Sequence, residues 1–137
     1  IKFQRGNMEI SYKITQGPQS SITLPIVSSE IEGTLIIKVK NKIIFNEENL
    51  LLLEFSIYIK QWLDRDEKPN FSYSSMEFEE KNILTFEKEK DDLWRINSVW
   101  FNKDQNNIYV MYPELINACT SFINKLKNDF KGITFQY

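Results

Sequence analysis

Acidic residues are concentrated in one short segment and are the strongest chemical signal in the sequence. Between residues 77 and 92, seven acids minus three lysines leave a local charge of −4. Paired carboxylates can transfer protons or hold a divalent metal, and the same charges can attract a basic protein surface. The acids are Glu77, Glu79, Glu80, Glu87, Glu89, Asp91 and Asp92.

A carboxylate-dependent hydrolase, metal-assisted or not, would use Glu77, Glu79 and Asp92. Such chemistry needs a cleft and two differently tuned carboxylates, whereas the sequence here predicts a hairpin of exposed charges. The chain has no histidine, and its four glycines lie too far apart for a phosphate-binding loop. Its single cysteine, Cys119, lies in an apolar stripe typical of a core thiol. We therefore predict no enzymatic activity, no cofactor and no metal, and interpret the seven acids as partner-binding residues.

Two shorter patterns carry weaker signals. Residues 64–66 begin like a calcium loop, but Lys68 stands where a ligand belongs and Pro69 where the loop needs glycine. Arg95 and Asn97 fall on the outward face of a predicted strand, where polar residues need no functional explanation. We assign neither pattern a role.

The composition indicates one folded domain spanning residues 1–137. Hydrophobic residues make up 42% of the chain and aromatic residues 14%, which is enough for a core without disulfides. A net charge of −2 gives no basic footprint for nucleic acid. The longest apolar stretch, residues 50–59, is far shorter than the ~20 residues that cross a bilayer. We expect no nucleic-acid or membrane partner, and a single cysteine favours the reducing cytoplasm.

Alternating and helical hydrophobic patterns predict an α+β fold, a largely antiparallel sheet of about six to eight strands with two helices packed on it. Asn46 is the predicted N-cap of the first helix, which runs to about Leu63. The second helix begins at Pro113 and ends before Gly132. The predicted strands cover residues 8–15, 31–39, 43–45, 71–78, 83–88, 93–101, 108–111 and 133–137, with a hairpin turn at residues 40–41 and a bulge near residues 74–75.

The first predicted helix carries two apolar stripes, so it must be covered on two sides. Its main stripe contains Leu52, Phe55, Ile59 and Trp62, among others. Leu50, Leu53 and Ile57 form the second stripe. Another part of the same chain or a second copy could cover this stripe, and the second case makes these three residues a homodimer contact. A homodimer is therefore the alternative to a protein-binding module.

Several short motifs, in order, resemble small uncharacterised proteins of Bacillus-like bacteria, which are domains of unknown function. Chains of this kind are often immunity proteins that neutralise a toxin made by the same cell. The resemblance implies a protein partner. If the acidic segment contacts this partner, the partner should have a basic surface. No functional residues can be transferred from the resemblance, because the shared motifs consist of packing residues. They are Glu32-Gly33, Leu53-Glu54-Phe55, Trp62-Leu63, Phe71-Ser72-Tyr73, Met76-Glu77, Trp94-Arg95-Ile96 and Ser98-Val99-Trp100.

Overall fold

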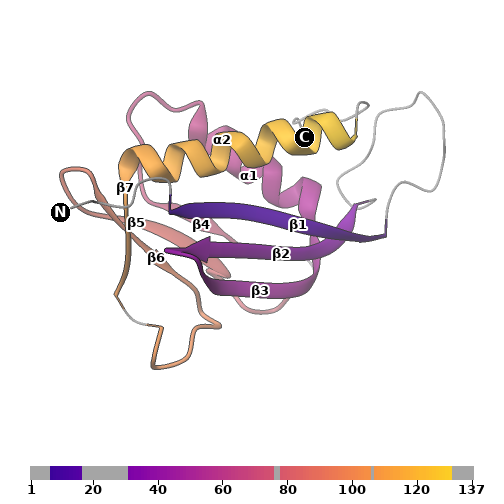
Figure 1. The fold of residues 1–137 in the computed structure, drawn as a ribbon, viewed down its shortest axis with the longest axis horizontal. Helices are drawn as coiled ribbons and strands as arrows, with labels where there is room; N and C mark the ends of the chain where they lie inside the picture. The colour runs from indigo at the N-terminus through magenta and orange to yellow at the C-terminus, as the bar shows by residue number, and fades with distance from the viewer. Residues whose placement is uncertain (1–6, 17–30, 76–77, 106, 131–137) are drawn as a thin grey trace.

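The computed structural model describes residues 7–16, 31–75, 78–105 and 107–130, and within them it shows an α+β fold (Figure 1). The helices are α1 (Leu52–Leu63) and α2 (Tyr112–Asp129). The strands are β1 (Met8–Gln16), β2 (Glu32–Val39), β3 (Lys42–Leu51), β4 (Phe71–Tyr73), β5 (Leu84–Lys90), β6 (Leu93–Asn97) and β7 (Ile108–Met111). The predicted class is confirmed. The prediction of a single sheet is wrong, because the strands form two antiparallel sheets, ordered β1-β2-β3 and β4-β5-β6-β7.

The predicted hairpin joins β2 to β3. Its turn residues, Lys40 and Asn41, have φ values of 53° and 63°. Two successive left-handed residues match the right-handed twist of paired strands. Along β2, Leu35, Ile37 and Val39 are buried while the residues between them are half-buried, so one face of this sheet covers the core.

The first helix begins five residues later than an Asn46 cap would place it. Asn46 lies inside β3, and α1 begins at Leu52. β3 remains paired with β2 as far as Leu51, with an irregularity near Asn49, whose φ is 62°. The pairing with β2 and the burial of the last two residues of β3 override the local capping preference.

Two strands of the second sheet end earlier than predicted. β4 ends at Tyr73 and β6 ends at Asn97, so the bulge predicted near residues 74–75 falls beyond the end of β4. After β6, the amide of Ser98 donates to Asn97 Oδ1 at 2.9 Å, and the amide of Trp100 donates to Ser98 Oγ at 3.0 Å. Bonds from side chains to the neighbouring backbone compete with the strand ladder, which ends there.

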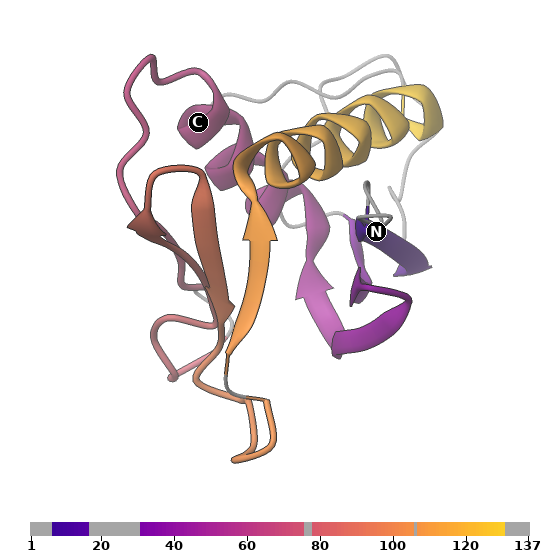
Figure 2. The ribbon, with the colours of Figure 1, turned by 60° about the vertical axis from the view of Figure 1, so that its left-hand side comes forward.

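Helix α1 contacts both sheets and α2, and aromatic side chains make much of this packing. Trp62 meets Phe71, Phe86 and Trp94 of the second sheet, with ring centroids 5.6 to 5.9 Å apart. The fully buried ring of Phe55 contacts β4 and α2. Figure 2 shows the two sheets diverging below the helices. The main stripe predicted for the first helix therefore lies in the shared core.

The second stripe predicted for the first helix is split between two elements, because Leu50 lies in β3 and only Leu53 and Ile57 lie in α1, and it is covered within the same chain. Leu50, Leu53 and Ile57 are 0%, 1% and 3% exposed. These side chains present almost no surface to a second copy in this structure. The second apolar stripe, which suggested a homodimer contact, is therefore explained by intramolecular packing.

Helix α2 lies along β1 (Figure 1), and it begins with Pro113 in its first turn as predicted. The hydroxyl of Tyr12 on β1 donates a hydrogen bond to the Asp129 carboxylate near the end of α2. This bond holds the pKa of Asp129 below its usual value. The ring of Tyr12 also contacts Phe122 edge to face at 5.8 Å. The predicted stop at Gly132 and the strand at 133–137 lie outside the described residues.

Neither described helix is long and apolar enough to cross a membrane.

Candidate functional site

The acidic segment is placed mainly around the β5–β6 hairpin, but it does not form one cluster. Glu79 and Glu80 lie in the loop before β5, while Asp91 and Asp92 form the turn after it. Seven residues of strand span roughly 20 Å at about 3.3 Å per residue, so the two pairs lie at opposite ends of β5. Glu77 lies outside the described residues.

This separation bears on the hydrolase hypothesis. Phe78, directly before Glu79, packs its ring 5.3 Å from that of Trp100, beyond the end of β6 that faces the start of β5. Asp92 lies at the other end of the hairpin. Across the described part of the chain, no three acidic or cysteine side chains are grouped closely enough to hold a metal ion. Glu79 and Asp92 are therefore not brought into one site.

The outer face of the second sheet carries the central residues of the acidic segment. We define this face by Thr85, Glu87, Arg95, Asn97, Tyr109 and Met111. Glu87 of β5 lies opposite Arg95 of β6, which lies opposite Tyr109 of β7. The opposite face is the buried one, with Phe86, Trp94 and Val110 in the core. The outer face is thus a row of half-buried polar groups, with Met111 46% exposed beside them.

The carboxylates of this hairpin bond to neutral hydroxyls. The Thr85 hydroxyl donates to Glu87 at 3.2 Å, and the Tyr109 hydroxyl lies 3.4 Å from Glu89 Oε1. The two ion pairs found among the described residues, Lys60–Asp64 and Lys125–Asp129, involve neither carboxylate. Neutral hydroxyl donors leave a carboxylate its full negative charge, so this charge remains available to a basic partner.

Arg95, like Asn97, is a residue of this face to which the sequence assigned no role. Its Nε atom is buried and has no hydrogen-bond partner within the described chain. A buried donor without a partner typically costs about 1 to 3 kcal/mol, and Arg is enriched at the centres of protein interfaces. The alternating pattern of the strand predicts that Arg95 lies on this face. It does not predict that Nε is buried, because this burial depends on residues of the neighbouring strands.

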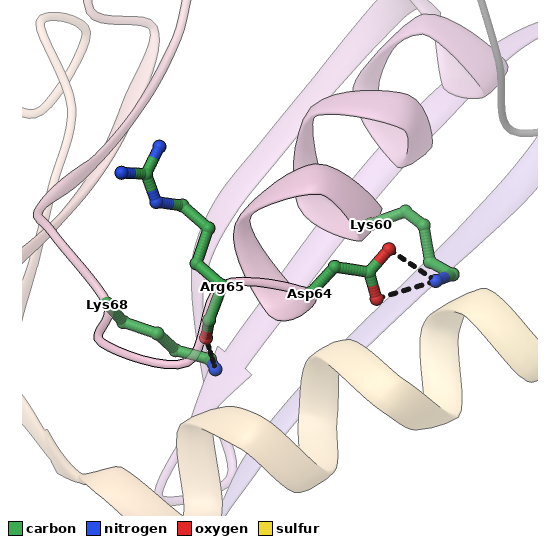
Figure 3. Close-up of polar contacts among 4 residues, drawn as sticks. All are labelled: Lys60, Asp64, Arg65 and Lys68. Atoms are coloured by element: carbon green, nitrogen blue, oxygen red, sulfur yellow. Dashed lines mark hydrogen bonds and ion pairs between the residues drawn. The ribbon is translucent and has the colours of Figure 1, made fainter.

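The end of α1 carries a second group of charges, shown in Figure 3. Lys60 Nζ contacts both Asp64 carboxylate oxygens, at 2.6 and 2.7 Å, and Lys68 Nζ donates to the Arg65 carbonyl at 2.6 Å. The Arg65 guanidinium points away from these contacts. Asp64, the first residue of the segment that resembles a calcium loop, is thus paired with Lys60. Exposed pairs of this kind contribute about 0 to 1 kcal/mol to stability.

A buried polar pair joins Tyr73 of β4 to Glu54 of α1 in the core. The Tyr73 hydroxyl donates to Glu54 Oε1 at 2.6 Å, and the two residues are 0% and 7% exposed. Burial, followed by this hydrogen bond, raises the pKa of Tyr73 well above its usual value. Cys119 is fully buried as predicted, and burial raises the pKa of its thiol. These groups are enclosed and do not extend the surface site.

The hydrogen-bonded Tyr73 should make the free energy of unfolding fall as the pH rises in the alkaline range. Because the pKa of Tyr73 is raised on folding, its contribution is complete below pH ~10 and falls as the pH rises above that value, by about 1.4 kcal/mol per unit. Urea unfolding at pH 9, 10 and 11 measures this slope. Tyr73→Phe should flatten it by that amount above pH 10. Equal slopes for the two proteins would show that Tyr73 is not responsible.

Sequence comparison places this fold in a family. The profile of a family described as "Domain of unknown function (DUF7878)" matches residues 8–132, and the chain belongs to this family. The match covers all the strands and helices described above. No curated protein matches the chain, and no solved structure does.

Proposed function

We propose that the chain is a protein-binding module of the immunity type, an inhibitor that neutralises a basic toxin domain in the cytoplasm of a Bacillus-like bacterium. The acidic β5–β6 hairpin and the outer face of the second sheet are the proposed contact surface. The module has no catalytic role in this proposal.

The observation that carries the proposal is the excess of unpaired acids in this segment. Six acids of the segment lie in the described residues, and none of them forms an ion pair there. Complementary charge speeds the encounter of two proteins and orients them. Arg95, Tyr109 and Met111 beside these acids supply residue types that are enriched in interface cores. Opposite charge at the rim and anchors at the centre are the usual organisation of a specific interface.

The test is a pull-down from the source bacterium followed by affinity measurement with the captured partner. In the double variant Glu89→Lys and Asp92→Lys, both changes are at exposed positions, so stability should change by less than about 0.5 kcal/mol. We expect affinity to fall at least tenfold, mainly through a slower on-rate, and the wild-type on-rate to fall with added salt.

Glu9→Lys with Glu67→Lys is the matched control. Both residues are exposed, and they lie on β1 and in the loop after α1. This variant changes the net charge by the same amount at other surfaces and should retain the affinity. Equal losses in the two variants would indicate an effect of net charge, and unchanged binding in both would exclude the acidic hairpin as the contact.

A further inference from the structure

A shallow groove of about 220 Å³ lies between the first half of β3 and the loop that joins β6 to β7. Its β3 side runs from Ile43 to Glu47, and its loop side consists of Trp100, Phe101 and Gln105. The rings of Phe45 and Trp100 stack with centroids 6.2 Å apart and join the two sides. Because pockets for drug-sized ligands usually occupy 300 to 1,000 Å³, this groove suits side chains of a polypeptide better than a cofactor.

The β3 side of the groove is the edge of a sheet. β3 pairs with β2 on one side only, so alternate backbone groups point away from the sheet, apart from an irregularity of the ladder between Ile43 and Phe45. The side-chain amide of Gln105 donates to the Ile44 carbonyl at 2.7 Å. This amide occupies the position that a backbone N–H of a neighbouring strand would take, so an added strand would displace it from the Ile44 carbonyl. Within the described chain, no strand pairs with this edge.

One exposed apolar residue lines the groove on its β3 side, and another precedes Trp100 in the chain. Ile43 on β3 is 54% exposed, and Val99, next to Trp100, is 53% exposed. An open edge beside exposed β-branched residues is a site where an added strand can gain both hydrogen bonds and apolar contacts.

The charge of the groove indicates the chemistry of its occupant. Glu47 lines it, and no lysine or arginine does. Burial, followed by repulsion from Glu48, raises the pKa of Glu47. Neither glutamate forms an ion pair within the described chain. Glu79 and Glu80 follow Phe78, whose ring contacts Trp100. A cation beside Glu47 would offset the charge of this carboxylate and its repulsion from Glu48.

We propose that this groove binds an extended segment of a partner polypeptide, which adds as a strand to the edge of β3 and places a lysine or arginine beside Glu47. This is a second interaction surface, on the other sheet from the acidic hairpin, and it stands or falls independently of the proposed toxin contact. Backbone hydrogen bonds would provide affinity, and the basic side chain would provide selectivity.

The test uses the intact wild-type chain, labelled with ¹⁵N, and a capped hexapeptide of alternating valine and lysine as the probe. We expect saturable shifts of the backbone amide signals of residues 43–47 and of the Trp100 indole signal. Replacing each lysine of the probe by glutamate should weaken binding at least tenfold. Methylation of the backbone nitrogens that face β3 should abolish it, because these donors form the strand pairing.

A protein variant tests the charge directly. Glu47→Gln should lower the affinity for the lysine peptide several-fold, whereas Glu9→Gln, a matched change at an exposed position of β1, should leave it unchanged. The proposal is overturned if the lysine and glutamate peptides bind equally, if saturating shifts map away from β3, or if millimolar peptide causes no shift. A loss of toxin binding by the hairpin variant would not affect these measurements.

Discussion

Replacing Trp62 by alanine is expected to lower the free energy of unfolding by about 3 to 5 kcal/mol. The side chain is 4% exposed and contacts three aromatic rings of the second sheet. Its indole nitrogen donates to the Pro69 carbonyl at 2.7 Å. Alanine would leave a cavity between α1 and this sheet and a carbonyl without its donor. Domains of this size are usually stable by about 5 to 15 kcal/mol, so the loss is a large share of the total.

Urea unfolding followed by far-ultraviolet circular dichroism measures this loss. Trp62→Phe is the informative intermediate, because it keeps an aromatic ring and removes the hydrogen bond, and it should cost less than half as much. Val99→Ala is the surface control and should change stability by less than about 0.5 kcal/mol. A similar small change for Trp62→Ala would mean that α1 does not depend on the second sheet.

The hairpin between β2 and β3 shows what the sequence can predict. Its alternating pattern, the turn at Lys40 and Asn41 and the burial of one face all follow from short-range signals. The second helix is similar, because its apolar stripe and Pro113 are local. The predicted start of the first helix was wrong for the opposite reason. The capping signal at Asn46 is local, whereas the pairing of β3 with β2, which overrides it, involves residues from another segment of the chain.

The break between the two sheets could not be predicted from strand patterns. Each strand shows which of its faces is buried, but not which strand lies next to it. The same limit applies to the acidic segment, where strand parity placed Arg95 on the outer face but not opposite Glu87. The groove depends wholly on such contacts, since it joins residues 43–47 to residues 100–105. Of its surroundings, only Glu79 and Glu80 of the acidic segment were visible as a sequence signal.

Replacing Gly33 by alanine adds a single methyl group, and we expect it to cause the second largest loss of stability. It lies in β2 opposite Ile14, and a Cβ atom added to it would lie 2.1 Å from the Lys13 carbonyl oxygen and 3.0 Å from Leu52 Cδ1. The first contact is with backbone and cannot be relieved by turning a side chain, so β1 must move away from β2. The Leu52 side chain must also give by a few tenths of an ångström. Overpacking usually costs about 1 to 3 kcal/mol, and we expect Gly33→Ala at the upper end. Thermal unfolding should show a decrease in Tm of roughly 10 °C, with Thr34→Ala as the neighbouring control in the same strand. A decrease as small as that of the control would show that β1 does not approach β2 this closely in solution.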